Sequence, residues 1–442
     1  MTNTAKLPLG LLLAVLLVAA PAAADGMLDP SFGNGGLVTT AFPGPFSNDA
    51  ALSLVMLPDG RAVAAGYTNV NLENTYMAVA RYLTTGALDT TFDGDGLVIV
   101  PFIFPPPSTD NGSEARAVLL QPDGRLVLVG WAAGGLPNQS VIALARLNAD
   151  GSLDTSFGTG GRVMTPMQGG ATAGLLQPDG RIVAVGQAGS SISAARYNTD
   201  GSLDPTFGNG GTLIVPLGGN FEIRDAKLQP DGKLVIAGTT PSSPFLSRDF
   251  ALVRLLPNGA LDTSFSGDGL ATADFGGIET GNSVIVLGDG RLVLAGSRGT
   301  ALPNTVTDFA ITRYMPDGSL DTSFGTAGLA LLDSGDPEYP EQLIQLFNGN
   351  LLVAGSTTNQ GALVDFLLAR LLPNGILDAS FGTGGFLRTD FGGGADGCYA
   401  VAIAAPDRIL TAGTKGGFPN VDFALARYIA TTPAALLTFA VE

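Results

Sequence analysis

The sequence predicts an all-β fold: a single seven-bladed β-propeller of four-stranded antiparallel blades, closed by an N-terminal strand that joins the last blade. Three observations lead to this prediction: one motif recurs along the chain, each period holds four apolar runs, and the two ends of the array carry complementary parts of one blade. The composition agrees, because 45% hydrophobic and 14% charged residues with 62 glycines and 28 prolines are typical of strands and turns.

The recurring motif is Leu-Asp-x-Ser/Thr-Phe, usually followed by a Gly-rich turn. Successive copies are 50 to 65 residues apart, a period that indicates a propeller or a solenoid. We therefore expect one repeated domain over residues 25–430, a leader over 1–24 and a tail over 431–442. The seven copies begin at Leu28, Leu88, Leu153, Leu203, Leu261, Leu320 and Leu377.

Each period is predicted to contain four strands, A to D. Two apolar runs joined by a Pro-Asp-Gly turn, as in residues 117–130, form strands A and B. A third run ends in arginine and forms strand C, and a short run after the next motif, as in 96–100, forms strand D. A parallel β-helix is the rival fold, but its short rungs should not carry a tight Pro-Asp-Gly hairpin.

The two ends of the array complete one blade. The chain opens with a strand D over residues 36–42 that follows no other strand, and it closes with strands A, B and C over 399–428. We predict that residues 36–42 pair with strand C at 423–428, which closes the ring and removes free sheet edges.

The motifs Leu-Asp-x-Ser-Phe-Gly-x-x-Gly, Pro-Asp-Gly-Arg-Leu-Val-Ala-Gly and Asp-Phe-Ala-Leu-Ala-Arg-Tyr resemble the bacterial "delta-sixty" β-propeller repeat over about residues 28–429. Three copies depart from the pattern at the A–B turn, with Gly288-Asp-Gly, Phe347-Asn-Gly and Pro406-Asp-Arg. The resemblance implies a propeller fold and an exported setting. It implies no chemistry, because that family shares a repeat and no activity.

The repeated charged and aromatic residues are interpreted as scaffold. The arginine that ends strand C stands eight residues before the aspartate of the next motif, from Arg81 and Asp89 to Arg370 and Asp378. Equal copies cannot make one active site. We therefore expect the aspartate to cap its turn, the arginine to pair between blades, and the motif phenylalanine to pack between blades.

The N-terminal residues predict export through a signal peptide, to the periplasm or the cell exterior. Lys6 precedes an apolar run over 9–20 and a small-residue end at Ala22–Ala24. An uncleaved anchor is the alternative, but the run is shorter than the roughly 20 residues that a spanning helix needs, so we expect no membrane span in the mature chain. The single cysteine, Cys398, permits no internal disulfide, and we expect a monomer held by packing.

Charge and composition narrow the function. A formal charge of −17 excludes nucleic acid as a partner. The absence of histidine excludes Ser-His-Asp triads and histidine-ligated metals. We expect a non-catalytic module that binds a polymer or a protein. Two alternatives stay open: a carboxylate-based polysaccharide hydrolase or lyase, and a purely structural envelope protein.

The variable D–A and B–C loops emerge on one face, and this face is the candidate site because the other turns are nearly uniform. Carboxylates, arginines and aromatics gather near the expected channel mouth. No catalytic residue is assigned. The candidate ligand-binding residues are Asp49, Glu114, Arg116, Trp131, Arg224, Asp225, Glu279, Glu341 and Asp396.

No cofactor is predicted, although calcium stays open. Residues 93–96, 110–114 and 266–269 offer clustered oxygen ligands, but none completes a twelve-residue calcium loop, and tight turns explain them better. Aspartates that precede a phenylalanine at the start of strand C are interpreted as caps rather than as a metal ring. They are Asp249, Asp308, Asp365 and Asp422.

Overall fold

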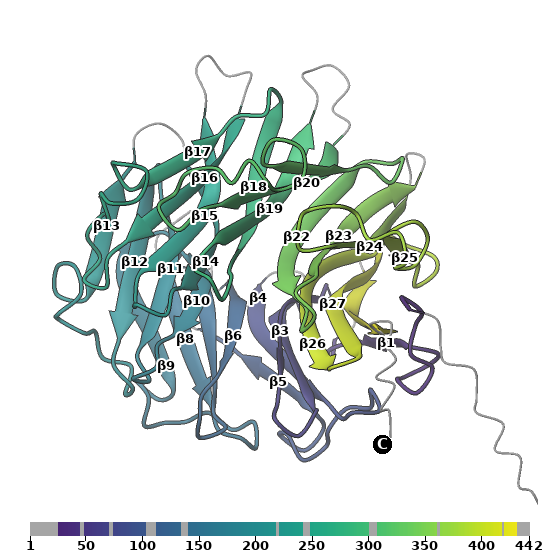
Figure 1. The fold of residues 1–442 in the computed structure, drawn as a ribbon. Helices are drawn as coiled ribbons and strands as arrows, with labels where there is room; N and C mark the ends of the chain where they lie inside the picture. The colour runs from purple at the N-terminus through teal and green to yellow at the C-terminus, as the bar shows by residue number, and fades with distance from the viewer. Residues whose placement is uncertain are drawn as a thin grey trace, which may run out of the picture.

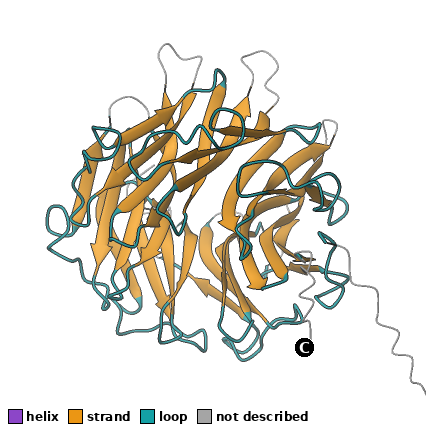
Figure 2. Ribbon diagram, viewed as in Figure 1, coloured by secondary structure: helices purple, strands orange, loops and turns teal. Residues whose placement is uncertain are grey.

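The computed structural model describes residues 25–44, 48–69, 74–102, 112–133, 140–217, 221–241, 248–299, 307–359, 363–417 and 420–430. These residues form strands and connections without a helix (Figure 2). In the same ranges, no helix is long and apolar enough to cross a membrane. The expected leader over 1–24 and tail over 431–442 lie outside them.

The strands come in runs of four, and within each run they pair antiparallel. We call each run a unit and its first strand the inner strand. Three units consist of β2 (Ala50–Met56), β3 (Ala62–Asn69), β4 (Thr75–Tyr82) and β5 (Leu97–Val100); β6 (Ser113–Leu120), β7 (Leu126–Ala133), β8 (Ser140–Leu147) and β9 (Arg162–Gln168); and β10 (Ala171–Leu176), β11 (Ile182–Ala188), β12 (Ser191–Tyr197) and β13 (Thr212–Pro216).

Three further units follow the same order. They consist of β14 (Glu222–Leu228), β15 (Leu234–Pro241), β16 (Arg248–Leu255) and β17 (Leu270–Ala273); β18 (Ile278–Val286), β19 (Leu292–Gly299), β20 (Thr307–Tyr314) and β21 (Leu329–Leu332); and β22 (Glu338–Gln345), β23 (Leu351–Asn359), β24 (Leu363–Leu371) and β25 (Phe386–Thr389). The β14–β17 and β18–β21 units share one parallel pair, Arg248 with Ile278, and so count as one eight-stranded sheet.

The remaining sheet joins the two ends of the chain. Strands β26 (Gly397–Ala405), β27 (Arg408–Gly417) and β28 (Asn420–Ile429) are completed by β1 (Leu37–Thr40). β1 pairs antiparallel with β28, from Leu37 opposite Ala426 to Thr40 opposite Phe423. Figure 1 shows this purple strand beside the yellow C-terminal sheet. The predicted pairing of residues 36–42 with 423–428 is therefore confirmed.

The inner strands surround a common centre (Figure 1). Each of them contacts the next, in the order β2, β6, β10, β14, β18, β22 and β26, and β26 contacts β2. This order follows from the chain, because each unit begins at the centre and ends at the rim.

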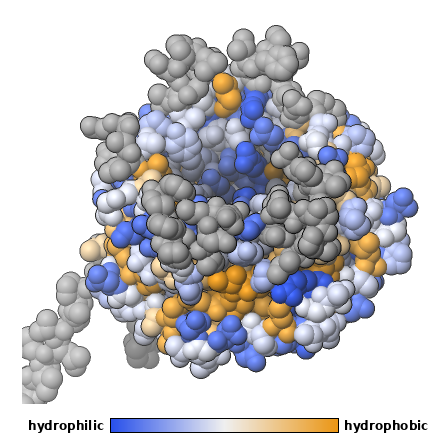
Figure 3. All heavy atoms as spheres, turned by 180° about the vertical axis from the view of Figure 1, so that it is seen from behind, coloured by the Kyte–Doolittle hydropathy of each residue, from blue (hydrophilic) through white to orange (hydrophobic). Residues whose placement is uncertain are grey.

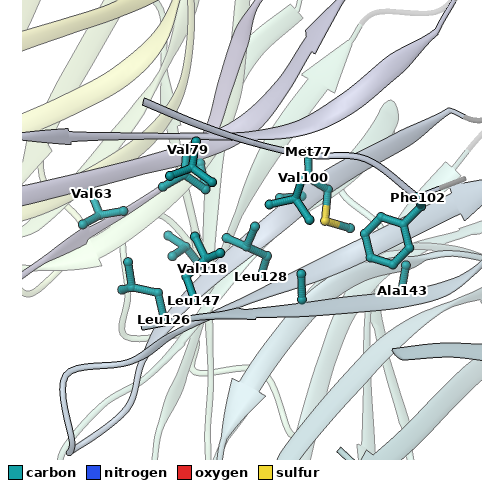
Figure 4. Packing of buried hydrophobic residues seen from close by; sticks show 14 of the residues in the cluster. Val63, Met77, Val79, Val100, Phe102, Val118, Leu126, Leu128, Ala143 and Leu147 are labelled. Atoms are coloured by element: carbon teal, nitrogen blue, oxygen red, sulfur yellow. The ribbon is translucent and has the colours of Figure 1, made fainter. Parts of the chain in front are cut away.

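The hydrophobic core lies between the faces of neighbouring units. In Figure 4, Val63 and Val79 of the β2–β5 unit lie opposite Val118 and Leu128 of the β6–β9 unit. All four side chains are buried. Because both faces of a unit are covered in this way, strands β3 and β4 consist almost entirely of apolar residues over their buried lengths.

A repeated contact, which we call the latch, joins each unit to the next at the rim. Arg196 Nε donates to Asp204 Oδ2 at 2.7 Å, its guanidinium lies 4.8 Å from the centre of the Phe207 ring, and its Nη1 donates to the carbonyl oxygen of Pro257 in the next unit at 2.7 Å. Asp204 Oδ1 also accepts the backbone N–H of Thr206 at 3.0 Å. Phe207 is fully buried.

The latch recurs along the chain, with ion-pair distances of 2.7 to 2.9 Å between Arg Nε and Asp Oδ2. The structural interpretation of the repeated arginine, aspartate and phenylalanine is thus confirmed. The other arginine–aspartate pairs are Arg81–Asp89, Arg146–Asp154, Arg254–Asp262, Arg313–Asp321, Arg370–Asp378 and Arg427–Asp29.

Candidate functional site

A cavity of about 340 Å³ lies at the centre of the molecule. Residues from every inner strand line it, and most of the lining is polar or charged. Figure 3 shows a hollow with hydrophilic residues near the middle of the face that it views. Of three other cavities on the described part of the chain, none is lined by residues of every inner strand, as this one is.

A β-bulge on each inner strand shapes this cavity. The register against the second strand of the unit shifts near the start of the inner strand, as between Ala115 and Ala117 in β6 or between Pro340 and Gln342 in β22, and β26 has a second shift between Ile403 and Ala405. The extra residue of such a bulge is unpaired in the ladder, so its side chain is re-aimed. These extra residues all line the cavity, and we call them the bulge ring: Leu52, Arg116, Thr172, Arg224, Asn282, Glu341 and Tyr399.

Three of the candidate residues, Arg116, Arg224 and Glu341, belong to the bulge ring, whereas sequence reasoning missed its other members. A usable signal exists, because six of the seven ring residues stand six positions before the first residue of the A–B turn, and Tyr399 stands seven before Pro406. Arg116 precedes Pro122 by this interval, and Glu341 precedes Phe347. Alignment of the repeats on their turns would have identified the position.

In four units, a polar side chain directly after the bulge binds a backbone N–H of the neighbouring unit. Asp225 Oδ2 accepts the backbone N–H of Val284 at 3.0 Å, and its two oxygens contact Lys227 Nζ at 2.7 and 2.8 Å. Asp225 therefore lines the cavity with a carboxylate that already has partners in Val284 and Lys227. Equivalent bonds run from the N–H groups of Val118, Leu343 and Val401 to Ser53, Ser283 and Gln342.

The charges of the cavity are nearly balanced. Arg116 forms an ion pair with Glu114 at 2.6 Å, and Arg224 forms a longer one with Glu222 at 3.4 Å. Glu341 lies in the same cavity, where burial raises the pKa of its carboxyl group to about 7 and the fields of the two arginines only partly oppose this. Glu341 thus changes charge near neutral pH.

Other polar groups of the ring lack protein partners or are half-buried. Asn282 Oδ1 is buried and has no hydrogen-bond partner among the described residues. Tyr399 is half-buried, and burial raises the pKa of its hydroxyl group. An unpaired buried oxygen is costly, so a ligand hydroxyl that donates to Asn282 would be favoured.

Three other candidate acids lie away from the cavity, just before or within the start of an inner strand. Asp49 is fully buried and accepts hydrogen bonds from Phe42 N at 2.8 Å and Thr68 Oγ1 at 2.6 Å. Asp396 accepts two backbone N–H groups, those of Phe391 and Gly416, at 2.8 and 3.3 Å. Glu279, in the same position, is also fully buried. None of these three acids lines the central cavity.

Burial raises the pKa of Glu279 to about 7, and the nearby Asp274 and Asp249 raise it further. Glu338 occupies the equivalent position in β22. Its pKa is also raised to about 7 by burial, against hydrogen bonds from Ser334. Sequence reasoning did not include Glu338 among the candidate site residues, although its spacing from the A–B turn matches that of Glu279.

The remaining candidates, Glu114 and Trp131, are cross-strand partners in β6 and β7. Glu114 acts through its ion pair with Arg116. Trp131 packs over Gly170 of the next unit, where an added Cβ would lie 2.3 Å from the Trp131 Cβ. Trp131 therefore fills space between units and does not line the cavity.

Two of the acidic turns are accounted for by their own backbone. Asp95 and Asp268 each accept the N–H group two residues ahead, from Leu97 and Leu270, at 2.9 Å. Asp93 and Ser266 adopt positive φ angles of 52° and 55°, as tight turns require. The stretch at 110–114 lies partly outside the described residues.

Comparisons with known proteins identify the repeat. A family model described as a domain of unknown function (DUF5122) beta-propeller matches residues 57–92, 121–157, 177–207, 229–265, 287–324 and 348–381. No curated protein matches the chain.

Several solved structures are similar at low sequence identity. A protein of unknown function from Dyadobacter fermentans is 15% identical over 90% of this chain and 100% of its own, with a TM-score of 0.45. Virginiamycin B lyase from Staphylococcus aureus is 12% identical over 88% of this chain and 98% of its own, with a TM-score of 0.45. YCF48 bound to D1 peptide is 13% identical over 90% and 97%, with a TM-score of 0.46.

Proposed function

Because the chain is a β-propeller repeat protein, we propose that it is an exported, non-catalytic propeller of seven blades that binds a carbohydrate in its central cavity. The blade count treats the eight-stranded sheet as two blades, since one residue pair alone links its halves. The β1–β28 pairing completes the last blade.

The bulge ring is the observation that carries this proposal. Every unit places one side chain at the same position of the cavity wall, and these side chains are all of different types except for the two arginines. The latch, by contrast, keeps the same three residue types. A rigid frame that repeats its contacts at the rim and varies its side chains at the centre is suited to specific recognition.

The chemistry of the cavity favours a sugar. Its volume of about 340 Å³ lies near the lower end of ligand pockets and suits the end of a glycan chain. Sugar hydroxyls can donate to Asn282 and Glu341 and accept from Arg116 and Arg224, while Tyr399 offers an aromatic ring. The near balance of charge disfavours a highly charged ligand.

Export and a monomeric state are part of this proposal. The first described residues are tied to the fold, because Asp25 Oδ2 accepts a hydrogen bond from Arg370 Nη2 at 2.5 Å and Gly26 N donates to Ile429 O at 2.8 Å. Residue 25 thus suits a mature start. N-terminal sequencing of protein from periplasmic and culture fractions tests cleavage, and light scattering tests the monomer.

A glycan array probed with residues 25–442, followed by calorimetry with the best hit, tests the binding function. We expect Arg224→Ala and Asn282→Ala to lower affinity at least about tenfold, a loss of about 1.4 kcal/mol. Arg162→Ala, on the rim strand β9, is the matched control and should leave affinity unchanged. The central cavity is not a glycan site if the array shows no hit. The same conclusion follows if Arg224→Ala binds the glycan as tightly as the control Arg162→Ala.

One observation favours a second candidate, carboxylate-based glycan hydrolysis or elimination. A carboxyl group with a pKa near 7, such as that of Glu341, is suited to general acid or base catalysis. This candidate predicts release of reducing ends from the bound glycan by the wild type and its loss in Glu341→Gln. Binding without turnover supports the non-catalytic function.

A further inference from the structure

Three carboxylates gather at the junction between the β14–β17 and β18–β21 units. Asp249 lies in β16, Asp274 follows β17, and Glu279 lies in the inner strand β18. One oxygen from each lies within 4.8 Å of the others. Calcium holds its oxygen ligands at about 2.3–2.6 Å, so ligands on opposite sides of the ion are about 4.6–5.2 Å apart. This spacing allows the three carboxylates to share one ion.

Glu279 has no adequate partner within the protein. It is fully buried, and neither carboxylate oxygen has a hydrogen-bond partner of good geometry among the described residues, although the backbone N–H of Phe275 faces the carboxyl group. The Nε atom of Arg298 lies 3.6 Å from Oε1, which is too far for a hydrogen bond. Asp249 Oδ1 is likewise buried and unpartnered in the described part of the chain. Leaving such buried groups unpaired destabilises the folded state.

In a second cluster of the same molecule, the buried carboxylates are stabilised by partners within the protein. Asp365, Asp390 and Asp396 occupy the equivalent junction and gather within the same distance. There, Arg388 Nε donates to Asp365 Oδ2 at 2.6 Å, and two backbone N–H groups donate to Asp396. A guanidinium group tethered to the fold supplies the positive charge.

The first cluster has a weaker tethered charge, because the ion pair between Arg298 and Glu279 is 3.6 Å long, against 2.6 Å for Arg388 and Asp365. Thr389 pairs with Phe366 in the second junction, and Ala273 pairs with Phe250 in the first, so Arg388 and Thr272 are equivalent positions. Thr272 supplies no charge. Both clusters thus hold three carboxylates at equivalent positions, with glutamate in place of one aspartate in the first, and they differ in how closely a cation is bound.

We propose that Asp249, Asp274 and Glu279 bind a calcium ion that joins the β14–β17 and β18–β21 units. The ligands are carboxylate oxygens from both units, without nitrogen or sulfur, which selects a hard cation such as Ca²⁺ over Zn²⁺. The ion lies beside the Arg248–Ile278 pair, the strand pairing that links these units. It would replace the function that Arg388 performs in the second cluster.

A matched pair of variants tests this site. Asp274 and Asp390 are both exposed, and each accepts the N–H of a glycine two residues ahead, at 2.7 and 2.5 Å. Asp274→Asn and Asp390→Asn should therefore affect folding alike. In calorimetric titrations of chelator-treated protein, we expect about one Ca²⁺ per chain with a Kd below about 1 mM, weakened at least about tenfold by Asp274→Asn alone.

Thr272→Arg gives an independent test. The introduced guanidinium should take the place of the ion, so this variant is expected to fold, to lose calcium binding and to lose the rise in Tm that calcium gives the wild type. The proposal is overturned if the wild type binds no Ca²⁺ up to about 10 mM, if Asp390→Asn weakens binding as much as Asp274→Asn, or if Thr272→Arg retains the calcium response.

Discussion

The latch and the bulge ring both occur once per unit, yet they use repetition in opposite ways. In the latch, arginine, aspartate and phenylalanine keep their identity and their ion-pair geometry around the molecule. In the bulge ring, the backbone geometry repeats while the side chain changes from leucine to arginine, threonine, asparagine, glutamate and tyrosine. The rim therefore holds the fold, and the centre is free to vary.

Burial explains this difference. The latch side chains are almost wholly buried between units, so any change leaves a cavity or an unpaired charge. The ring side chains border a cavity and can change without disturbing packing. Four predictions, in order of decreasing effect, test whether stability depends on the latch and on a buried carboxyl group more than on the ring.

Phe207→Ala should have the largest effect. Removal of this fully buried ring leaves a cavity between two units and should lower the free energy of unfolding by about 3–5 kcal/mol. Denaturant unfolding with an unchanged m-value measures this loss. An unchanged midpoint would contradict the packing role of the latch.

Glu338→Gln should alter the dependence of stability on pH. The pKa of this buried carboxyl group is raised to about 7, so the folded state binds more protons than the unfolded state between about pH 4.5 and 7. The group therefore contributes stability at pH 5 that is lost as the pH rises through 7, up to about 3 kcal/mol. With chelator present, the stability difference between pH 5 and pH 8 should shrink in the variant. An identical difference would contradict the raised pKa.

The latch should lose stability as the pH falls, whereas the contribution of Glu338 is lost as the pH rises. Although burial opposes it, hydrogen bonds from Ser264 and the ion pair with Arg254 lower the pKa of Asp262 to about 2. The unfolded state then binds more protons below about pH 4, so this group loses up to about 2 kcal/mol of stability as the pH falls from 5 to 2. Asp262→Asn should show a shallower acid transition, measured by circular dichroism across that range. An equally steep transition would exclude a contribution from this latch.

Arg224→Ala should have the smallest effect on stability. Its side chain is 50% exposed and its ion pair with Glu222 is 3.4 Å long, so the free energy of unfolding should change by less than about 1 kcal/mol. Thermal unfolding of Arg224→Ala and Phe207→Ala under the same conditions compares the two losses of stability. A loss comparable to that of Phe207→Ala would show that the ring is part of the scaffold.

Sequence patterns could predict the scaffold because its signals repeat. The fixed interval between Arg196 and Asp204 anticipated the latch, and the incomplete ends of the array anticipated the β1–β28 pairing. Single candidates were harder to place. Asp49 and Asp396 were expected beside Glu341, but they lie outside the cavity lining and bind backbone N–H groups.

The bulge ring escaped prediction because a bulge adds one residue without breaking the apolar pattern of the strand. Leu52 in particular looks like an ordinary core residue. The acidic clusters escaped for a different reason. Asp249 and Glu279 lie in two strands and Asp274 directly follows a third, so the pairing of these strands brings the three together.

A crystal structure of the exported chain with its best-binding glycan is the most direct measurement. If the bulge ring is the recognition site, the terminal sugar will lie in the central cavity, with its hydroxyl groups within hydrogen-bonding distance of Arg224, Asn282 and Glu341. A glycan bound at the rim or on the outer surface, with only water in the cavity, would contradict this.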